Sequence, residues 1–297
     1  MQQRLSALSG GKTAAGVGFM LLSMMLMASM DATAKYLVSD YAIVQILWVR
    51  FVIFLVVALV LAGRRGIQRA VASRHWKLQI VRSLVLLAEA AVFILGFSLL
   101  PLADVHAVAA VAPLIATALA VPLLGEKVGP HRWTAVAVGL IGVLIIIRPG
   151  ADALSWSAAV PLAAAFLWAL YQVLVRKVGL DDAVTTTALY TAVVGLIVLS
   201  VLAPFVWRAP DLEGWLLMLL VGVLGAGAHI ILFKAFALAP ASFLQPFGYF
   251  LLVWAAFLGF VVFHHIPDVW TIIGAIVVVA GGLYALHRER LRKRRPG

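Results

Sequence analysis

The sequence predicts an all-α polytopic membrane protein with about ten transmembrane helices. Hydrophobic residues make up 64% of the 297 residues and charged residues only 12%. In soluble domains, hydrophobic residues average about 45–50% and charged residues about 25%. A soluble fold of this length needs a polar surface that this composition cannot supply. The composition therefore excludes a soluble enzyme and a disordered chain, and the lack of cysteine excludes a secreted disulfide scaffold.

Ten apolar runs are each long enough to cross the hydrocarbon core as a helix, which takes about 20 residues. They use up most of the chain, so we expect no soluble domain between them. The runs cover residues 14–36, 41–62, 78–98, 102–124, 131–148, 155–176, 184–206, 212–235, 240–263 and 268–286. Prolines mark the ends of several runs, as expected for a residue that interrupts helices. They are Pro101, Pro130, Pro149, Pro210, Pro240 and Pro267.

Within the first half, the opening run follows basic residues and could be taken for a signal peptide. It is longer than a typical signal h-region and nine more runs follow, so we expect a retained helix. The second and third runs are joined by a short basic connection, residues 63–77, with Trp76 where an interfacial aromatic would lie. The fourth run contains Pro113, a candidate kink, and the fifth is rich in glycine.

In the second half, the eighth run contains three glycines between Gly222 and Gly227. Their order does not match a dinucleotide-binding loop, and close packing through small residues explains them better. The ninth run carries Pro246, which would loosen the backbone and free carbonyl groups there. A basic segment, residues 287–297, follows the tenth run.

Basic residues are distributed unevenly between the two sides of the membrane. With the N-terminus inside, most of the 23 Lys and Arg residues lie in loops and ends that face the cytoplasm. The positive-inside rule then predicts that both termini are cytoplasmic. The Arg-rich end could bind nucleic acid, but an anchor beside anionic lipid explains the same charges. We therefore expect membrane lipids and no nucleic acid as partners.

The two halves of the chain resemble each other at an offset near 140 residues. Phe97-Ser-Leu-Leu-Pro101 at the start of the fourth span recurs as Phe236-Ala-Leu-Ala-Pro240 at the start of the ninth. Five spans per half is an odd number, so the second half must cross the membrane in the opposite direction. Such inverted repeats are a recurring plan of secondary transporters, with the substrate site at the repeat interface. We expect repeats at 14–148 and 155–286, then a basic cytoplasmic tail at 287–297.

These features resemble the drug/metabolite transporter (DMT) superfamily, and more narrowly its EamA-type members with two five-helix repeats. The resemblance is carried by Trp48-Val-Arg50-Phe in the second span, by Pro101 and Pro240, and by Gly125-Glu126-Lys127 before the glycine-rich fifth span. It implies secondary transport of a small metabolite, often an amino acid, across a bacterial inner membrane. We expect a monomer or homodimer that exports an amino acid or related solute.

Ionisable residues inside a membrane cost about 2.5–3.5 kcal/mol each, so each needs a partner or a function. Arg50 and Glu89 lie deep in the second and third spans, and Asp31 lies near the outer end of the first. These three residues are candidates for binding a zwitterionic substrate, with Arg50 holding a carboxylate and an acidic residue binding an amine. A purely structural ion pair remains an equal alternative.

Two histidines are candidates for proton coupling, because imidazole exchanges protons near neutral pH. His106 is about one turn into the fourth span, and His229 lies deep in the eighth. The alternative is that each is a hydrogen-bonded packing element.

Aromatic and polar residues of the sixth and ninth spans are candidate substrate contacts. Trp168, Tyr171 and Gln172 have the i, i+3, i+4 spacing that places them on one helical face. Gln245 and Tyr249 flank Pro246 in the ninth span. Simple packing of the helix bundle is the competing interpretation.

No cofactor or metal site is expected. The segment from Ser6 to Thr13 ends like a phosphate-binding loop but lacks its first glycine and a preceding strand, and His264 and His265 are adjacent rather than spaced for zinc. The sequence therefore favours a solute transporter that works by alternating access, driven by an ion gradient, exchange or downhill flow. An intramembrane enzyme acting on lipid or peptide and a lipid-headgroup flippase are the alternatives.

Overall fold

The computed structural model describes residues 2–63, 72–125, 130–147, 157–178, 182–238, 244 and 247–293. Throughout these ranges the chain is built of helices, with no strand. The helices are α1 (Gln2–Leu37), α2 (Ile43–Gly63), α4 (Trp76–Leu99), α5 (Leu102–Ala109), α6 (Ala112–Leu124), α7 (Pro130–Ile147), α8 (Ala159–Val178), α9 (Val184–Leu202), η1 (Ala203–Phe205), α10 (Leu212–Leu238), α12 (Phe250–Phe263) and α13 (Val269–Lys293). The predicted all-helical fold class is confirmed.

Most helix ends fall within a few residues of the predicted ones, but two helices extend further. The helix α1 begins at Gln2, and α13 continues to Lys293 through most of the predicted basic tail. This extension has a local cause, because Arg, Leu, Glu and Lys are good helix formers and the next proline is Pro296.

The fourth predicted span is broken in the middle. The helix α5 ends at Ala109, α6 begins at Ala112, and Pro113 occupies the first turn of α6. Proline is tolerated there because the first backbone N–H groups of a helix have no partner within the helix. The candidate kink at Pro113 is therefore confirmed. Together the two pieces, Leu102–Leu124, are long and apolar enough to cross a membrane.

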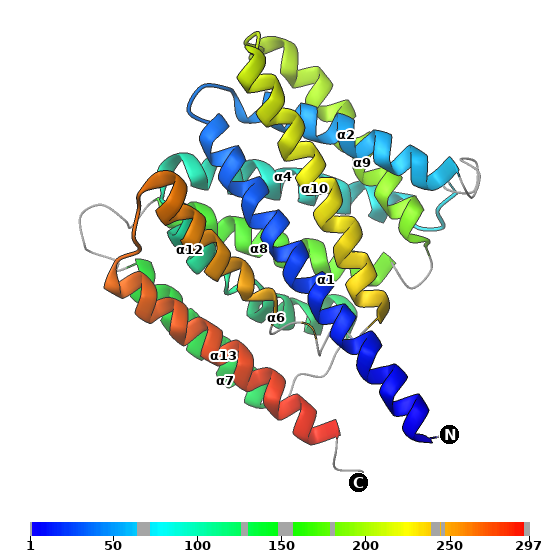
Figure 1. Cartoon of the computed structure of the whole chain (residues 1–297), viewed down its shortest axis with the longest axis vertical. Coiled ribbons are helices and arrows are strands. Elements are labelled where there is room, and N and C mark those ends of the chain that lie inside the picture. Colours follow the sequence, from blue (N-terminus) through cyan, green and yellow to red (C-terminus); the bar gives the residue numbers. More distant parts are fainter. Residues whose placement is uncertain are drawn as a thin grey trace.

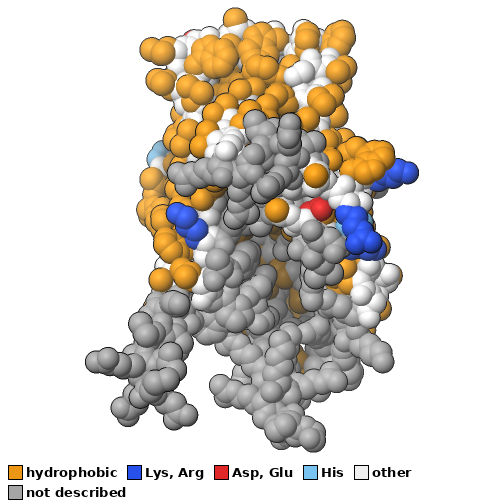
Figure 2. Space-filling model, turned by 90° about the vertical axis from the view of Figure 1, so that its right-hand side faces the viewer, with side chains coloured by type: hydrophobic (Ala, Val, Ile, Leu, Met, Phe, Trp, Pro, Cys, Tyr) orange, Lys and Arg blue, Asp and Glu red, His pale blue; other side chains and the backbone are white. Residues whose placement is uncertain are grey.

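The outer surface of the molecule suits a hydrocarbon environment. In the described part of the chain, six helices have the length and hydropathy of a membrane span, and four further apolar helices are shorter. Large apolar side chains are exposed on their outward faces, among them Val60, Ile197 and Ile276 at 65%, 61% and 62%. Figure 2 shows hydrophobic side chains covering the upper part of one face. The protein is a multi-pass membrane protein.

Two pairs of neighbouring helices pack through small residues. The helices α1 and α10 run side by side (Figure 1), and the Ser23 hydroxyl donates a hydrogen bond of 2.8 Å to the Ala228 carbonyl. The helices α7 and α13 form a second pair. A Cβ added to Gly142 would lie 2.9 Å from the Gly274 carbonyl oxygen, and one added to Gly274 would lie 2.6 Å from that of Gly142. Glycine at both positions is what allows these backbones to approach.

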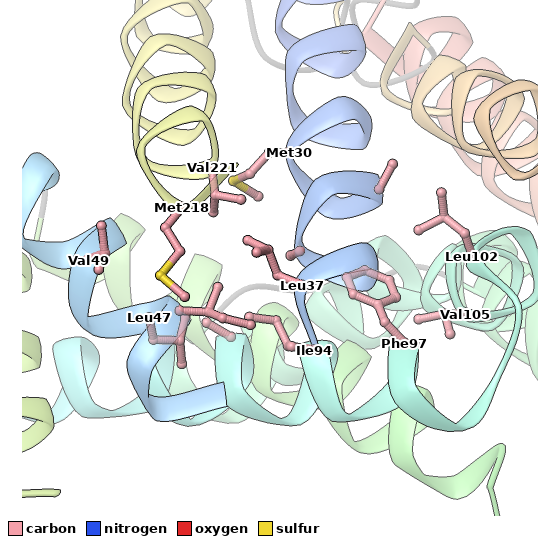
Figure 3. Packing of buried hydrophobic residues seen from close by; sticks show 14 of the residues in the cluster. Met30, Leu37, Leu47, Val49, Ile94, Phe97, Leu102, Val105, Met218 and Val221 are labelled. Carbon is pink, nitrogen blue, oxygen red and sulfur yellow. The ribbon is translucent and has the colours of Figure 1, made fainter. Parts of the chain in front are cut away.

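The largest apolar cluster joins helices that are distant in the sequence. Met30 and Leu37 of α1 meet Ile94 and Phe97 of α4, and Met218 of α10 packs on the same cluster (Figure 3). The cluster holds α1, α2, α4 and α10 together and thereby positions the polar residues described next.

Candidate functional site

An internal cavity of about 40 Å³ lies among α2, α4, α8, α9 and α10. Its polar lining consists of Arg50, Tyr171, Thr187, Thr191 and His229, and aromatic rings of Phe51 and Phe54 form part of the apolar wall. A water molecule occupies about 30 Å³ in the liquid, so the cavity has room for a few waters at most. The cavity beside Arg50 is therefore narrow in this structure.

Arg50 of α2 is the cation at the centre of the predicted charged cluster. Its guanidinium interacts electrostatically with Asp31 of α1 and with Glu89 of α4. Neither carboxylate forms an ion pair with Arg50 within 4 Å in the described part of the chain. The structure therefore brings the three predicted charges near one another and leaves Arg50 without a direct carboxylate partner.

Asp31 instead lies beside His106 of α5. The Oδ2 atom of Asp31 is 3.5 Å from Nε2 of His106, and both side chains are buried. Phe93 and Phe97 pack their rings against the imidazole at 5.3 and 5.8 Å between centres. His106 thus belongs to a buried acid–base pair, and neither of its two residues is among those that line the cavity.

His229 of α10 lines the cavity with Arg50. Its Nδ1 is 2.8 Å from the carbonyl oxygen of Gly225, one turn earlier in the helix. A carbonyl only accepts, so Nδ1 donates and Nε2 is the acceptor of the neutral ring. The imidazole also packs edge-on against Phe54 at 6.1 Å. His229 thus makes the packing contacts of the alternative interpretation and also lines the cavity, while its role in proton coupling stays a prediction.

Small residues of α10 bring it close enough to α1 and α2 to form this wall. A Cβ added to Gly225 would lie 2.9 Å from the Met30 sulfur and 3.5 Å from Nε of Arg50. One added to Gly222 would lie 2.2 Å from the Ile53 side chain. The glycines between 222 and 227 therefore serve helix packing, as the sequence predicted.

The aromatic candidates separate into two groups. Tyr171 lines the cavity and stacks on Trp168 of the same helix, α8, at 5.4 Å. Gln172 follows on α8 and is not among the cavity-lining residues. Tyr249 packs on α13, where a Cβ added to Gly282 would collide with its phenol, so it too lies away from this cavity. Gln245 lies outside the described residues.

A polar network that the sequence did not single out joins the starts of α4 and α9; we call it the α4–α9 latch. Arg82 donates through Nη2 to the Thr187 carbonyl at 2.9 Å and to the Thr191 hydroxyl at 2.7 Å, and through Nε to Gln79 at 3.1 Å. Gln79 donates to Asp182 at 2.9 Å. The only sequence signals were an arginine inside a span and two threonines one turn apart in an apolar run.

A second set of polar contacts, the α2–α10 latch, joins the starts of α2 and α10. Tyr41 donates to Asp211 at 3.1 Å, and Gln45 exchanges two hydrogen bonds with the backbone of Arg208, at 2.7 and 3.1 Å. The pKa of Asp211 is held below its ordinary value by hydrogen bonds from the Gly214 amide and from Tyr41. The helices of the two latches correspond at the offset near 140 residues, α2 with α9 and α4 with α10.

Comparisons with known proteins agree with this architecture. The chain matches the EamA-like transporter family at residues 14–148 and 155–286. It is 29% identical to a riboflavin transporter of Vibrio cholerae over 94% of this chain and 95% of that protein. It is 26% identical to an S-adenosylmethionine uptake transporter of Rickettsia bellii over 93% of this chain and 94% of that protein.

A solved crystal structure shares the fold with a TM-score of 0.60 and 19% identity, over 95% of this chain and 99% of that chain. The family model matches the chain on both sides of the connection between α7 and α8. The two relatives are named as transporters of small metabolites, and the chain matches them along nearly their whole length. This chain belongs to the EamA-like transporter family.

Proposed function

We propose that the protein is a secondary transporter that takes up a small metabolite with a planar heteroaromatic ring, working by alternating access. The observation that carries this proposal is the narrow cavity lined by Arg50, which lies between helices of the first and second halves of the chain. A site at the interface of two halves can be opened by moving one half against the other.

The lining of the cavity suits a ring with polar substituents. Tyr171, Phe51 and Phe54 offer aromatic faces and edges, and ring contacts contribute about 0.5–1.5 kcal/mol beyond burial. Thr187, Thr191 and His229 add hydrogen-bonding groups. Riboflavin and S-adenosylmethionine, after which relatives are named, both combine a heteroaromatic ring with a hydroxylated sugar-derived group.

An amino-acid substrate and export are the finer expectations from the sequence, and the names of these relatives do not favour either. One relative is named for uptake, and we therefore propose uptake as the direction. The cluster of Arg50 with Asp31 and Glu89 does suit the zwitterionic head group of an amino acid, because its carboxylate and its ammonium group would each meet an opposite charge there. Amino acids are therefore the second substrate class to test.

The two latches supply the gates that alternating access requires. We propose the bacterial inner membrane as the location, with both termini in the cytoplasm. This orientation places the α4–α9 latch on the cytoplasmic side and the α2–α10 latch on the outer side. Both sets of hydrogen bonds are formed in this structure, in which the cavity is small.

Transport into sealed proteoliposomes tests the proposal directly. Radiolabelled riboflavin, S-adenosylmethionine and a panel of amino acids are offered to vesicles containing the purified protein, with protein-free vesicles as the control. We expect saturable accumulation of a ring-containing substrate. Absence of flux for every solute, together with cleavage of a lipid or peptide, would establish the intramembrane-enzyme alternative. Movement of a fluorescent lipid headgroup between leaflets instead would establish the flippase.

A further inference from the structure

Arg82 is a fully buried cation without a carboxylate partner. None of its surface is exposed, and no Asp or Glu oxygen lies within 4 Å of its guanidinium in the part of the chain that the structure describes. The Nη1 atom is buried and has no hydrogen-bond partner among the described residues. A buried charge with an unused donor is expensive inside a membrane, so it calls for a ligand.

The rest of the guanidinium is held in a fixed position. Its Nη2 and Nε atoms are occupied by Thr187, Thr191 and Gln79, and Gln79 is itself held by Asp182. The planar group therefore cannot turn to satisfy Nη1, which is left as a single oriented donor.

Arg82 lies behind the wall of the cavity, in contact with three residues that line it. Its guanidinium is 5.4 Å from the ring centre of Tyr171, and the two threonines that it contacts line the same cavity as Tyr171. The phenol of Tyr171 interacts with the guanidinium electrostatically and as a weak hydrogen-bond partner, but no described residue offers Nη1 an acceptor in good geometry within 3.5 Å. A widening of the cavity at Tyr171 would bring a substrate group to Nη1.

The acidic residues of the site interact with Arg50 and with Tyr171, and neither Asp31 nor Glu89 acts on Arg82. Asp31 and Glu89 both interact electrostatically with Arg50. Asp182, the acidic residue of the α4–α9 latch, accepts hydrogen bonds from Gln79 and Ser73. Around Tyr171 the site therefore holds two cations, Arg82 and Arg50, and one acid, Glu89, and Arg82 keeps an unused donor.

We propose that Arg82 binds an oxyanion of the transported metabolite, a carboxylate or a phosphate, at the α4–α9 end of the cavity. This inference rests on the proposed transport function, since the ligand is the transported molecule. It defines the substrate class more narrowly, as a ring-bearing metabolite with an acidic group. A charge-assisted bond to a guanidinium is about twice as strong as a neutral hydrogen bond, so the acidic group would contribute strongly to selection.

Two matched ligand pairs test this assignment by binding to the purified full-length protein in nanodiscs. Riboflavin and riboflavin 5′-phosphate differ by a phosphate, and phenylalanine and phenylalanine amide differ by a carboxylate. We expect the anion of at least one pair to bind about tenfold more tightly, which corresponds to about 1.4 kcal/mol. The pair with the larger preference identifies which oxyanion the site takes.

Three variants separate recognition from folding. Arg82→Gln should remove the preference for the anion while leaving the affinity for the neutral member unchanged, and Arg82→Lys should retain part of it. Lys234→Gln removes an exposed charge on α10 and should change neither affinity. If Arg82→Gln does not fold, Thr191→Val keeps the charge but removes a hydrogen bond that orients the guanidinium, and should reduce the ratio of anion affinity to neutral-ligand affinity.

Equal affinities within both pairs for the wild-type protein would overturn the proposal, and so would a preference that survives Arg82→Gln. If no ring-bearing ligand binds, only the proposed substrate class is wrong. Binding of inorganic phosphate then tests the role of Arg82. Thermal stabilisation of the wild type by phosphate, absent from Arg82→Gln, would support the anion subsite. No stabilisation of the wild type would overturn it.

Discussion

Asp31 and His106 form a buried pair, 3.5 Å apart, that links α1 to α5. Asp31 also interacts electrostatically with Arg50, so one carboxylate connects the histidine to the cavity. A proton taken up by this pair would change the charge that Arg50 experiences. Protonation of the Asp31–His106 pair would therefore alter the electrostatic environment of Arg50 in the cavity.

The first prediction concerns proton coupling. His106→Gln should abolish the stimulation of uptake by an imposed pH gradient, because glutamine keeps the size of the side chain but does not titrate. Uptake into vesicles with and without the gradient measures this. His229→Gln is the comparison variant, because Nδ1 of His229 is engaged by the Gly225 carbonyl. A gradient effect that persists in His106→Gln and is lost in His229→Gln would assign the coupling to His229.

The second prediction concerns Arg50 as a substrate-binding residue. Arg50→Ala should reduce uptake at least about a hundredfold, since it removes a charged contact worth about 3 kcal/mol and leaves Asp31 and Glu89 without their cation. The amount of protein in the membrane, measured by immunoblot, should stay unchanged. Lys234→Gln is the control for loss of a basic residue outside the cavity. Wild-type uptake by Arg50→Ala would remove this residue from the site.

The third prediction concerns the contact between α7 and α13. Gly142→Ala should lower the free energy of unfolding by about 1–3 kcal/mol, because the new methyl group would lie 2.9 Å from the Gly274 carbonyl and 2.7 Å from a Val278 methyl group. Thermal unfolding in detergent provides the measurement. Gly18→Ala is the matched control, since a Cβ there meets nothing within 4 Å and alanine favours helix. A Gly142→Ala variant as stable as Gly18→Ala would contradict the close approach.

The fourth prediction concerns pH and the α2–α10 latch. Hydrogen bonds from the Gly214 amide and Tyr41 lower the pKa of Asp211, so the ionised carboxylate stabilises the latch above the pKa of the unfolded chain. This stabilisation is lost as the pH falls through the lowered pKa. The unfolding temperature should therefore drop less on acidification in Asp211→Asn than in the wild type. Equal drops in both proteins would show that Asp211 does not hold the latch.

The fifth prediction concerns the two gates. The sequence contains no cysteine, so introduced pairs can be cross-linked without background reactions. Ser73 and Asp182 hydrogen-bond across the α4–α9 latch, and replacing both with cysteine should give a disulfide that stops uptake until it is reduced. Each single-cysteine variant serves as a control. Full transport by the cross-linked protein would show that this latch does not have to open.

Much of the fold could be predicted because the membrane acts on each segment separately. A span needs about 20 apolar residues wherever it lies in the chain, so composition and length revealed the ten spans. The break at Pro113 followed from the missing N–H of proline, which is a property of that residue alone. The far end of α13 was missed because basic residues were interpreted only as an anchor, although they also favour helix.

The partners of the charged residues depended on packing. The sequence identified Arg50, Asp31 and Glu89 as charges needing partners, but it could not show that Asp31 pairs with His106. Likewise Arg82 was visible inside a span, while its hydrogen-bond partner Thr191 is 109 residues away. Apolar content and local periodicity determined how often this chain crosses a membrane and which charges are unusual. The tertiary structure alone decided which charges meet, because contacts between distant helices depend on how their surfaces pack and not on neighbours in the sequence.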